Sequence, residues 1–149
     1  MTKVRLLERE DRSVWDDLWG QYQTFYKTQI SVETSNVTFE RMLDDNVPIN
    51  GLVAELDGIV IGIVHYIFHY STWTVGPYCY LQDLYTLPEA RGKGVASALI
   101  KAVYAKAEAH GASRVYWLTH ESNQVGIKLY EKVADRSGFI QFRKMMPVS

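Results

Sequence analysis

The stretch that most constrains the fold runs from Leu81 to Ile100, LQDLYTLPEARGKGVASALI. Residues 81–87 are apolar and aromatic enough for a buried strand, and Pro88 ends that strand because proline has no N–H to donate. From Val95 onward, apolar residues recur at the three-to-four-residue spacing of a helix. The chain is therefore predicted to contain a strand that leads through a glycine-rich turn into a helix.

The turn within this stretch is predicted to bind a phosphate group. Gly92 and Gly94 alternate there with the cationic residues Arg91 and Lys93. Glycines let backbone N–H groups approach an anion closely, and the first four N–H groups of a helix have no partner within the helix. The helix dipole adds about half a positive charge at the same end. We therefore expect a phosphate cradle at Gly92–Ser97.

The spacing of the glycines decides which kind of phosphate site this is. No G-x-x-x-x-G-K-[ST] pattern can be drawn here, so the turn is not a P-loop, and the third glycine of the Rossmann pattern would fall on Ser97. The remaining pattern is Arg91-x-x-Gly94-x-Ala96. It resembles the pyrophosphate motif Q/R-x-x-G-x-G/A of the GNAT acetyltransferases.

Two further tracts carry the same resemblance, the strand Tyr80–Leu84 and the tract Val115–Asn123 with Leu129-Tyr130 downstream. They are similar to the GNAT branch that contains polyamine and histone acetyltransferases. The resemblance implies an α/β (mixed α+β) GNAT fold, with a mixed central sheet of six to seven strands and helices on both faces. It also implies one N-acetyltransferase domain over residues 1–149.

The resemblance implies acetyl-CoA as co-substrate and no metal. The family's cofactor lies like an extra strand in the gap between the central strand and the strand after the third helix. One backbone N–H there polarises the thioester carbonyl, as in an oxyanion hole. The cofactor-binding residues implied are Leu84, Tyr85 and Thr86 on the strand, Arg91, Gly92, Lys93, Gly94, Val95, Ala96 and Ser97 at the turn, and Asn123 and Gly126 downstream.

The predicted general acid is Tyr130. It follows Asn123 by seven residues, so both project from one face of a predicted helix. The helical pattern alone favours a core tyrosine. The family resemblance instead implies an acid that protonates the leaving thiolate.

The sequence offers several candidates for the general base, because polyamine-acetylating relatives carry Leu-Glu-Asp where this chain reads Leu81-Gln82-Asp83. Gln82 cannot accept a proton. Asp83 remains a candidate, as base or as anchor for a cationic amine, if a β-bulge turns it toward the cleft. A purely structural carboxylate is the alternative, and His120 and Glu121 are further candidates for the base.

An aromatic helix is predicted near the start of the chain, capped by Asp11 or Ser13. Its apolar stripe, which indicates core packing, consists of Trp15, Leu18, Tyr22 and Phe25. Trp19 and Tyr26 lie off that stripe. They are the predicted substrate-binding residues, because aromatic ring faces attract alkylammonium groups.

The remaining elements follow from local patterns. Strands are expected at residues 3–7, 52–56, 59–70, 78–87, 114–119 and 138–146, and helices at 95–110 and from 122 or 123 to about 133. Asp57-Gly58 is a hairpin signal, residues 31–36 are expected to form a loop, and a short helix is expected to follow and end by Asn46. His65 and His69 would lie about 13 Å apart on a strand, which makes chelation of a metal implausible.

Composition narrows the class of protein. A length of 149 residues fits one domain, and a net charge of −1 argues against nucleic-acid binding through bulk electrostatics. The single cysteine, Cys79, is expected to be buried and suits a reducing compartment. No signal peptide is apparent, and no apolar run approaches the roughly 18–20 residues of a membrane span. These features predict a soluble cytoplasmic protein.

The function predicted from the sequence is an acetyl-CoA-dependent N-acetyltransferase. It would transfer an acetyl group to a primary amine of a small molecule, such as a polyamine or amino acid, by direct attack in a ternary complex. A protein lysine or histone acetyltransferase is the first alternative. A non-catalytic acyl-CoA-binding module is the second, kept open by Gln82. A homodimer is also implied, since relatives often pair through their C-terminal strands and Phe139–Met146 is apolar.

Overall fold

The structure is a computed structural model and describes residues 1–148. The chain folds as two compact units, Met1–Leu118 and Thr119–Ser149. In the first unit the helices and strands are β1 (Thr2–Leu6), α1 (Arg12–Phe25), α2 (Val32–Met42), β2 (Ile49–Leu56), β3 (Ile59–His69), β4 (Tyr78–Thr86), α3 (Val95–Ala109) and β5 (Val115–Tyr116). Short 3-10 turns, η1 (Arg9–Asp11) and η2 (Pro88–Ala90), precede α1 and follow β4. The second unit contains α4 (Gln124–Val133).

The five strands form one sheet in the order β1-β2-β3-β4-β5. The first four strands are antiparallel to their neighbours, and β5 is parallel to β4, so the sheet is mixed as predicted. The predicted hairpin joins β2 to β3. Asp57 and Gly58 have φ values of 52° and 80°, the left-handed pair that a two-residue type I′ turn requires.

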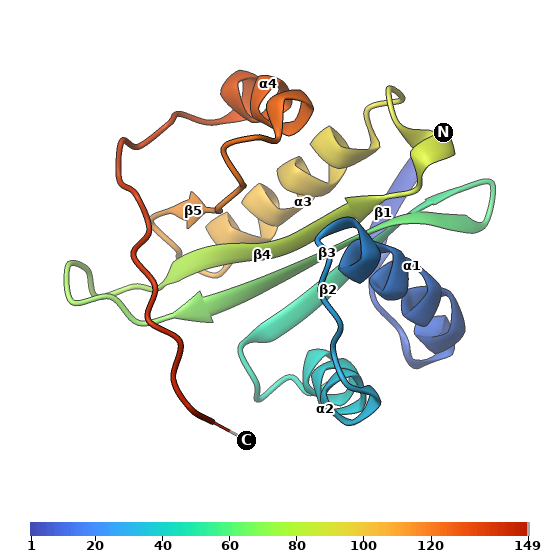
Figure 1. The fold of residues 1–149 in the computed structure, drawn as a ribbon, viewed down its shortest axis with the longest axis horizontal. Helices are drawn as coiled ribbons and strands as arrows, with labels where there is room; N and C mark the ends of the chain where they lie inside the picture. The colour runs from blue at the N-terminus through green and yellow to red at the C-terminus, as the bar shows by residue number, and fades with distance from the viewer. Residues whose placement is uncertain (149) are drawn as a thin grey trace. The chain divides into compact units, whose positions relative to one another are not determined.

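Helices cover both faces of the sheet, which confirms that prediction (Figure 1). A Cβ atom placed on Gly62 of β3 would meet Val95 and Leu99 of α3. On the other face, α1 and α2 bury a separate hydrophobic core against the sheet. Its buried members are Leu7, Trp15, Leu18, Trp19, Phe39, Met42, Val53, Val60, Ile63 and Tyr85.

The sheet has five strands among residues 1–148, not the six or seven expected. Residues 138–146 form no strand, and β5 has two residues where six were expected. Phe139 and Phe142 are 85% and 88% exposed. A β-branched and aromatic composition favours a strand, but a strand also needs a neighbour to pair with, and residues 138–146 find none within the described chain.

The polar segment 31–36, expected as a loop, forms the first part of α2 instead. The Ser31 hydroxyl caps this helix by accepting a hydrogen bond from the Thr34 N–H at 3.1 Å. Ser35, Phe39 and Met42 are buried at four- and three-residue spacing. A capped start and a buried stripe therefore outweigh the low helix propensity of serine, threonine and asparagine.

The start of α1 also differs from the prediction. The Asp11 side chain makes no cap hydrogen bond to α1. Both of its oxygens accept from the Arg5 guanidinium at 2.9 Å, and Oδ2 also accepts from the Glu8 N–H. This ion pair holds the pKa of Asp11 below its ordinary value. Phe25, expected in the core stripe, is 53% exposed. No helix within residues 1–148 combines the length and the apolar character needed to cross a bilayer.

Candidate active site

A β-bulge lies at the centre of the site. His65 of β3 pairs with Asp83 of β4, and the next residue, Tyr66, pairs with Leu81. Gln82 is therefore an extra residue in β4, as the predicted bulge requires. The Gln82 side chain is exposed, whereas Asp83 is mostly buried against α1, with 13% of its side chain accessible.

Two donors hold the Asp83 carboxylate. The Tyr22 hydroxyl of α1 donates to Oδ1 at 2.6 Å, and Nδ1 of His65 lies 2.9 Å from Oδ2. Burial, reinforced by the nearby Asp83 charge, raises the pKa of Tyr22 well above its ordinary value. Tyr22 therefore keeps its proton at physiological pH and acts as a hydrogen-bond donor.

Trp15 determines which nitrogen of His65 carries the proton. The Trp15 indole N–H donates to Nε2 of His65 at 2.9 Å. An indole N–H can only donate, so Nε2 is the acceptor and has no hydrogen. The proton of the neutral ring is then on Nδ1, from which it is donated to Asp83. The side chains of Trp15 and His65 are both buried.

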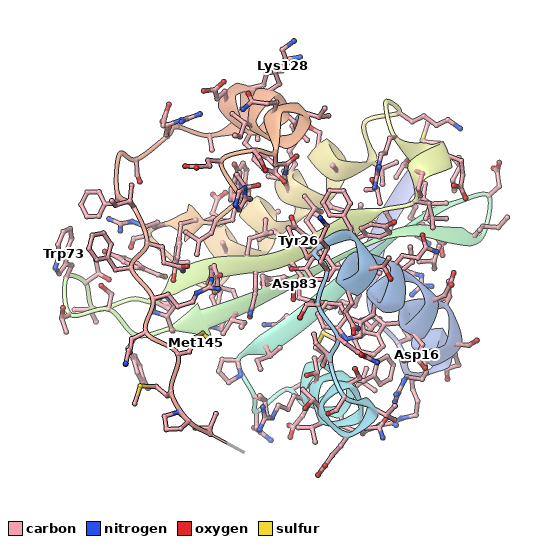
Figure 2. All side chains as sticks on the ribbon, in the orientation of Figure 1. Asp16, Tyr26, Trp73, Asp83, Lys128 and Met145 are labelled. Carbon is pink, nitrogen blue, oxygen red and sulfur yellow. The ribbon has the colours of Figure 1, made fainter. Side chains whose placement is uncertain are left out.

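Aromatic rings line the approach to the carboxylate. The Tyr22 ring stacks on Trp19 at 5.0 Å and tilts against Tyr26 at 4.8 Å. Tyr26 is 41% exposed, and Figure 2 labels it beside Asp83, where the end of α1 lies over β4. Burial and then the Asp83 charge raise the pKa of Tyr26. Tyr26 therefore offers an accessible ring close to the negative charge.

Trp19 does not fit the substrate role predicted for it. It is only 6% exposed, and its indole N–H donates to the Ser35 hydroxyl at 3.1 Å. Its ring is enclosed by the core between the sheet, α1 and α2. Trp19 supports Tyr22 by stacking and presents no face to a ligand.

The outer edge of β4 is open along the predicted cofactor residues. Within the described residues, β5 pairs only with Cys79 and Tyr80 of β4. The Leu87 N–H donates to Ile61 of β3 at 2.9 Å. Because N–H groups alternate along a strand, those of Leu84 and Thr86 point away from β3, toward the open edge. The segment Leu84–Thr86 can therefore pair with an extended, amide-containing ligand.

The turn predicted to bind a phosphate lies at the start of α3. Gly94 is the N-cap residue with φ 78°, Gly92 has φ 77°, and no side chain caps the helix. A Cβ atom at either glycine would find no neighbour within 4 Å, so the space above the turn is open. Left-handed glycines, uncapped helix N–H groups and Lys93 together suit a pyrophosphate.

Arg91, also predicted to bind the cofactor, directs its side chain elsewhere. Its guanidinium carbon lies 5.8 Å from the Phe25 ring centre and 5.7 Å from that of Tyr85. These contacts stabilise the arginine as cation–π interactions. Arg91 thereby contributes to a cleft of about 640 Å³ lined by Asp16, Asp17, Gly20, Gln21, Thr24, Phe25, Tyr85, Pro88 and Arg91.

The second unit contains the downstream residues of the predicted site. Asn123 is the N-cap of α4, accepting from the Gly126 N–H at 3.2 Å and donating to the Thr119 hydroxyl at 3.0 Å. A Cβ atom on Gly126 would come within 2.4 Å of the Asn123 amide nitrogen, so the cap requires this glycine. Tyr130 is half-buried two turns further along α4. The catalytic role of Tyr130 and the cofactor role of Asn123 remain predictions.

The structure places His65, Tyr22 and Trp15 around Asp83, and none of the three was predicted from the sequence as a site residue. His65 had been considered only as a metal ligand with His69. Within the part of the chain that the structure describes, no cluster of histidine, cysteine, aspartate or glutamate could hold a metal ion. The sequence signal for His65 was its position inside the apolar run Ile59–Phe68. A polar side chain that is buried in such a run needs a hydrogen-bond partner.

Cys79 fits its predicted role as a small buried residue. It is fully buried on β4, and burial raises the pKa of its thiol to about 12. The thiol therefore stays protonated and is not activated as a nucleophile.

Comparison with known proteins agrees with this geometry. Residues 11–134 match the model of the acetyltransferase (GNAT) family. The chain is similar to the D-amino-acid N-acetyltransferase HPA3 of Saccharomyces cerevisiae, at 36% identity over 143 residues that cover 95% of this chain and 89% of that protein. It is also similar to the thialysine N-epsilon-acetyltransferase of Mus musculus, at 33% identity over 57% of this chain and 52% of that protein.

Solved structures show the same fold. The ribosomal-protein-alanine N-acetyltransferase of Brucella melitensis biovar Abortus superposes with a TM-score of 0.82 at 24% identity, covering 98% of this chain and 99% of that one. AAC(6')-Iy, in complex with a bisubstrate analogue of CoA, gives a TM-score of 0.84 at 20% identity, covering 98% and 99%.

Proposed function

The chain belongs to the GNAT family of acetyltransferases and is an acetyl-CoA-dependent N-acetyltransferase, and from this premise we propose that its acceptor is the primary amine of a small molecule. Two relatives support this class of acceptor, because their names specify D-amino acids and thialysine. A single structural observation carries the proposal. It is a carboxylate, Asp83, held by the Tyr22 hydroxyl and by His65 beside the accessible ring of Tyr26.

The arrangement around Asp83 suits an ammonium group. Both oxygens already accept a hydrogen bond, from Tyr22 and His65, so the carboxylate is fixed in place. Tyr26 offers a ring face beside it, and ring faces attract alkylammonium groups. We therefore assign Asp83 the role of anchor for the cationic amine.

Acetyl-CoA supplies the acetyl group as a thioester. The main chain of Leu84–Thr86 is proposed to pair with the pantetheine amides, and one of its N–H groups to polarise the thioester carbonyl. Residues Gly92–Ser97 would hold the pyrophosphate, and Asn123 and Gly126 would complete the cofactor contacts. Tyr130 would return a proton to the leaving thiolate.

The amine must lose its proton before its nitrogen can attack. Gln82 has no basic atom, and Asp83 serves as the anchor in this scheme. We place proton release at the exposed bulge, where water reaches Gln82. Activity should accordingly rise as the pH approaches the ordinary pKa of the acceptor amine.

The decisive experiment follows acetyl-CoA consumption with a panel of acceptors. The panel contains D- and L-amino acids, thialysine, diamines and a lysine-containing peptide. We expect turnover with one or more of the small amines and little with the peptide. Acetylation of the peptide alone would replace this proposal with a protein acetyltransferase.

We also propose a cytoplasmic location and a homodimer. The buried thiol of Cys79, the one cysteine in the chain, is consistent with a reducing compartment. The apolar segment 138–148 is exposed in the single chain and is the surface proposed for pairing with a second copy.

A further inference from the structure

Asp83 carries a charge that the surrounding protein does not neutralise. Among residues 1–148 its ion-pair partner is His65, which would carry a positive charge only if protonated on both ring nitrogens. Its other partner, Tyr22, is a neutral phenol. Burying an uncompensated charge is costly, so such a site favours the arrival of a cation.

Trp15 prevents His65 from supplying that cation. A proton added to Nε2 of His65 would point at the Trp15 indole N–H, with the two nitrogens 2.9 Å apart. Neither N–H could accept a hydrogen bond from the other. Trp15 is fully buried and packs against Phe39 with ring centres 5.1 Å apart, so the indole has little freedom to turn away.

We propose that Trp15 and His65 are positioning residues that set the charge of the acceptor site. Trp15 keeps His65 neutral, and neutral His65 orients Asp83 without cancelling its charge. Asp83 then presents its full negative charge to an ammonium group. This inference rests on the proposed function, because it assumes that the acceptor arrives as a cation.

The alternative state of the site would bind an amine poorly. If His65 were an imidazolium, it would form an ion pair with Asp83, and the pair would have no net charge. An incoming ammonium would meet a positive ring at nearly the same distance as the carboxylate, so attraction and repulsion would largely cancel. A donor opposite Nε2, which Trp15 provides, disfavours this state.

Two substitutions and their combination test the proposal. Trp15→Phe removes the indole N–H and leaves His65 free to take a second proton. His65→Asn keeps a neutral N–H donor near the position of Nδ1 and cannot become charged. The readout is the KM for the acceptor amine at pH 6.5, close to the ordinary imidazole pKa of about 6.5. The KM for acetyl-CoA and the melting temperature are measured alongside.

We expect Trp15→Phe to raise the amine KM by about tenfold or more with little change in the KM for acetyl-CoA. His65→Asn, which also replaces a partner of Asp83, gives the reference amine KM for a side chain that cannot become charged at this position. The double variant Trp15→Phe/His65→Asn should recover most of the lost affinity, because the asparagine cannot neutralise Asp83. A double variant at least as impaired as Trp15→Phe would overturn the proposal, since simple loss of packing is not repaired by a second substitution.

A measurement on the unaltered protein gives an independent test if Trp15→Phe does not fold. Nitrogen-15 NMR of histidine-labelled protein distinguishes a protonated ring nitrogen from an unprotonated one. We expect His65 with a proton on Nδ1 and none on Nε2 at neutral pH. An imidazolium or the opposite tautomer would refute the charge-setting role. The NMR measurement needs no acceptor, so it remains valid even if the proposed class of acceptor is wrong. An error in the acceptor class would be seen separately in the amine panel.

Discussion

At the residue scale, a substitution of Asp83 can distinguish an anchor for the cationic amine from a general base. Asp83→Asn removes the negative charge and leaves one oxygen for the two donors, Tyr22 and His65. We expect kcat/KM for the amine to fall by at least about 10²-fold, mainly through a higher KM, as loss of an anchor requires. Steady-state kinetics with the amine varied at saturating acetyl-CoA measure this.

The control for this variant makes the same chemical change away from the site. Asp57→Asn, in the β2–β3 hairpin, also converts a carboxylate to an amide, and asparagine tolerates the positive φ of that turn. Its kinetics should match those of the starting protein. If Asp83→Asn instead lowers kcat with the KM unchanged, Asp83 is the general base and not the anchor.

Tyr130 is the second prediction at this scale. Tyr130→Phe removes the hydroxyl proposed to protonate the leaving thiolate and keeps the ring on α4. We expect kcat to fall by about 10²-fold or more, while the affinity for coenzyme A stays nearly the same. Single-turnover kinetics and calorimetry measure the two quantities. A variant that retains most of its kcat would assign Tyr130 to packing.

The bulge in β4 matters at the scale of the element, because it places Gln82 and Asp83 in consecutive positions opposite one partner residue, His65. Gln82→Glu restores the carboxylate that polyamine-acetylating relatives carry there. If deprotonation of the amine limits the rate, this variant should raise activity near neutral pH by several-fold or more and flatten the rise of activity with pH. Rate–pH profiles of both proteins test this. If the two rate–pH profiles superimpose, deprotonation of the amine does not limit the rate.

The turn before α3 is the second element with a specific prediction. Gly94→Glu places a side chain and a negative charge at the proposed pyrophosphate site. Affinity for coenzyme A should fall at least about tenfold, or about 1.4 kcal/mol, by calorimetry. Gly111→Glu is the matched control, since Gly111 has a similar φ of 81° beyond the other end of α3. Both variants bear comparable backbone strain, so equal affinities in the two would disprove the cradle.

Local signals explain which elements could be predicted. The Asp57-Gly58 hairpin, the glycine turn before α3 and the Asn123 cap depend on a few neighbouring residues, and the structure has all three. The first half of α2 could not be read the same way. Its helical state depends on burying Ser35 and Phe39 under α1 and the sheet, which is a tertiary effect that outweighs local propensity.

At the scale of the whole molecule, the fold could be predicted from the sequence. The arrangement of side chains at the proposed acceptor site could be predicted only in part. The motif around Gly94 identified the family and therefore the architecture. Asp83 and Tyr26 had signals in the sequence and remain predictions as site residues, whereas the contact between Trp15 and His65 had no signal, because it joins residues 50 apart in the chain. Helical spacing likewise does not reveal that Trp19 is buried and donates a hydrogen bond to Ser35 of α2.

The association state is the remaining property at this scale. In segment 138–148 the chain exposes six large apolar side chains, Phe139, Ile140, Phe142, Met145, Met146 and Val148. Exposed apolar side chains close together in the chain are typical of an interaction surface, so we expect this segment to be covered by a second copy. Light scattering at micromolar concentration should give a mass of twice 17.1 kDa.

A substitution within the segment sharpens this prediction. Phe142→Asp should shift the mass to that of one chain, with little loss of stability in the monomer, because Phe142 is already exposed there. Val75→Asp, at an exposed apolar residue on the β3–β4 loop, is the control and should leave the dimer intact. A starting protein that scatters as a monomer would contradict pairing through this segment. A Phe142→Asp variant that remains dimeric would place the interface on another surface, since a carboxylate buried between two apolar segments could not be accommodated without a partner.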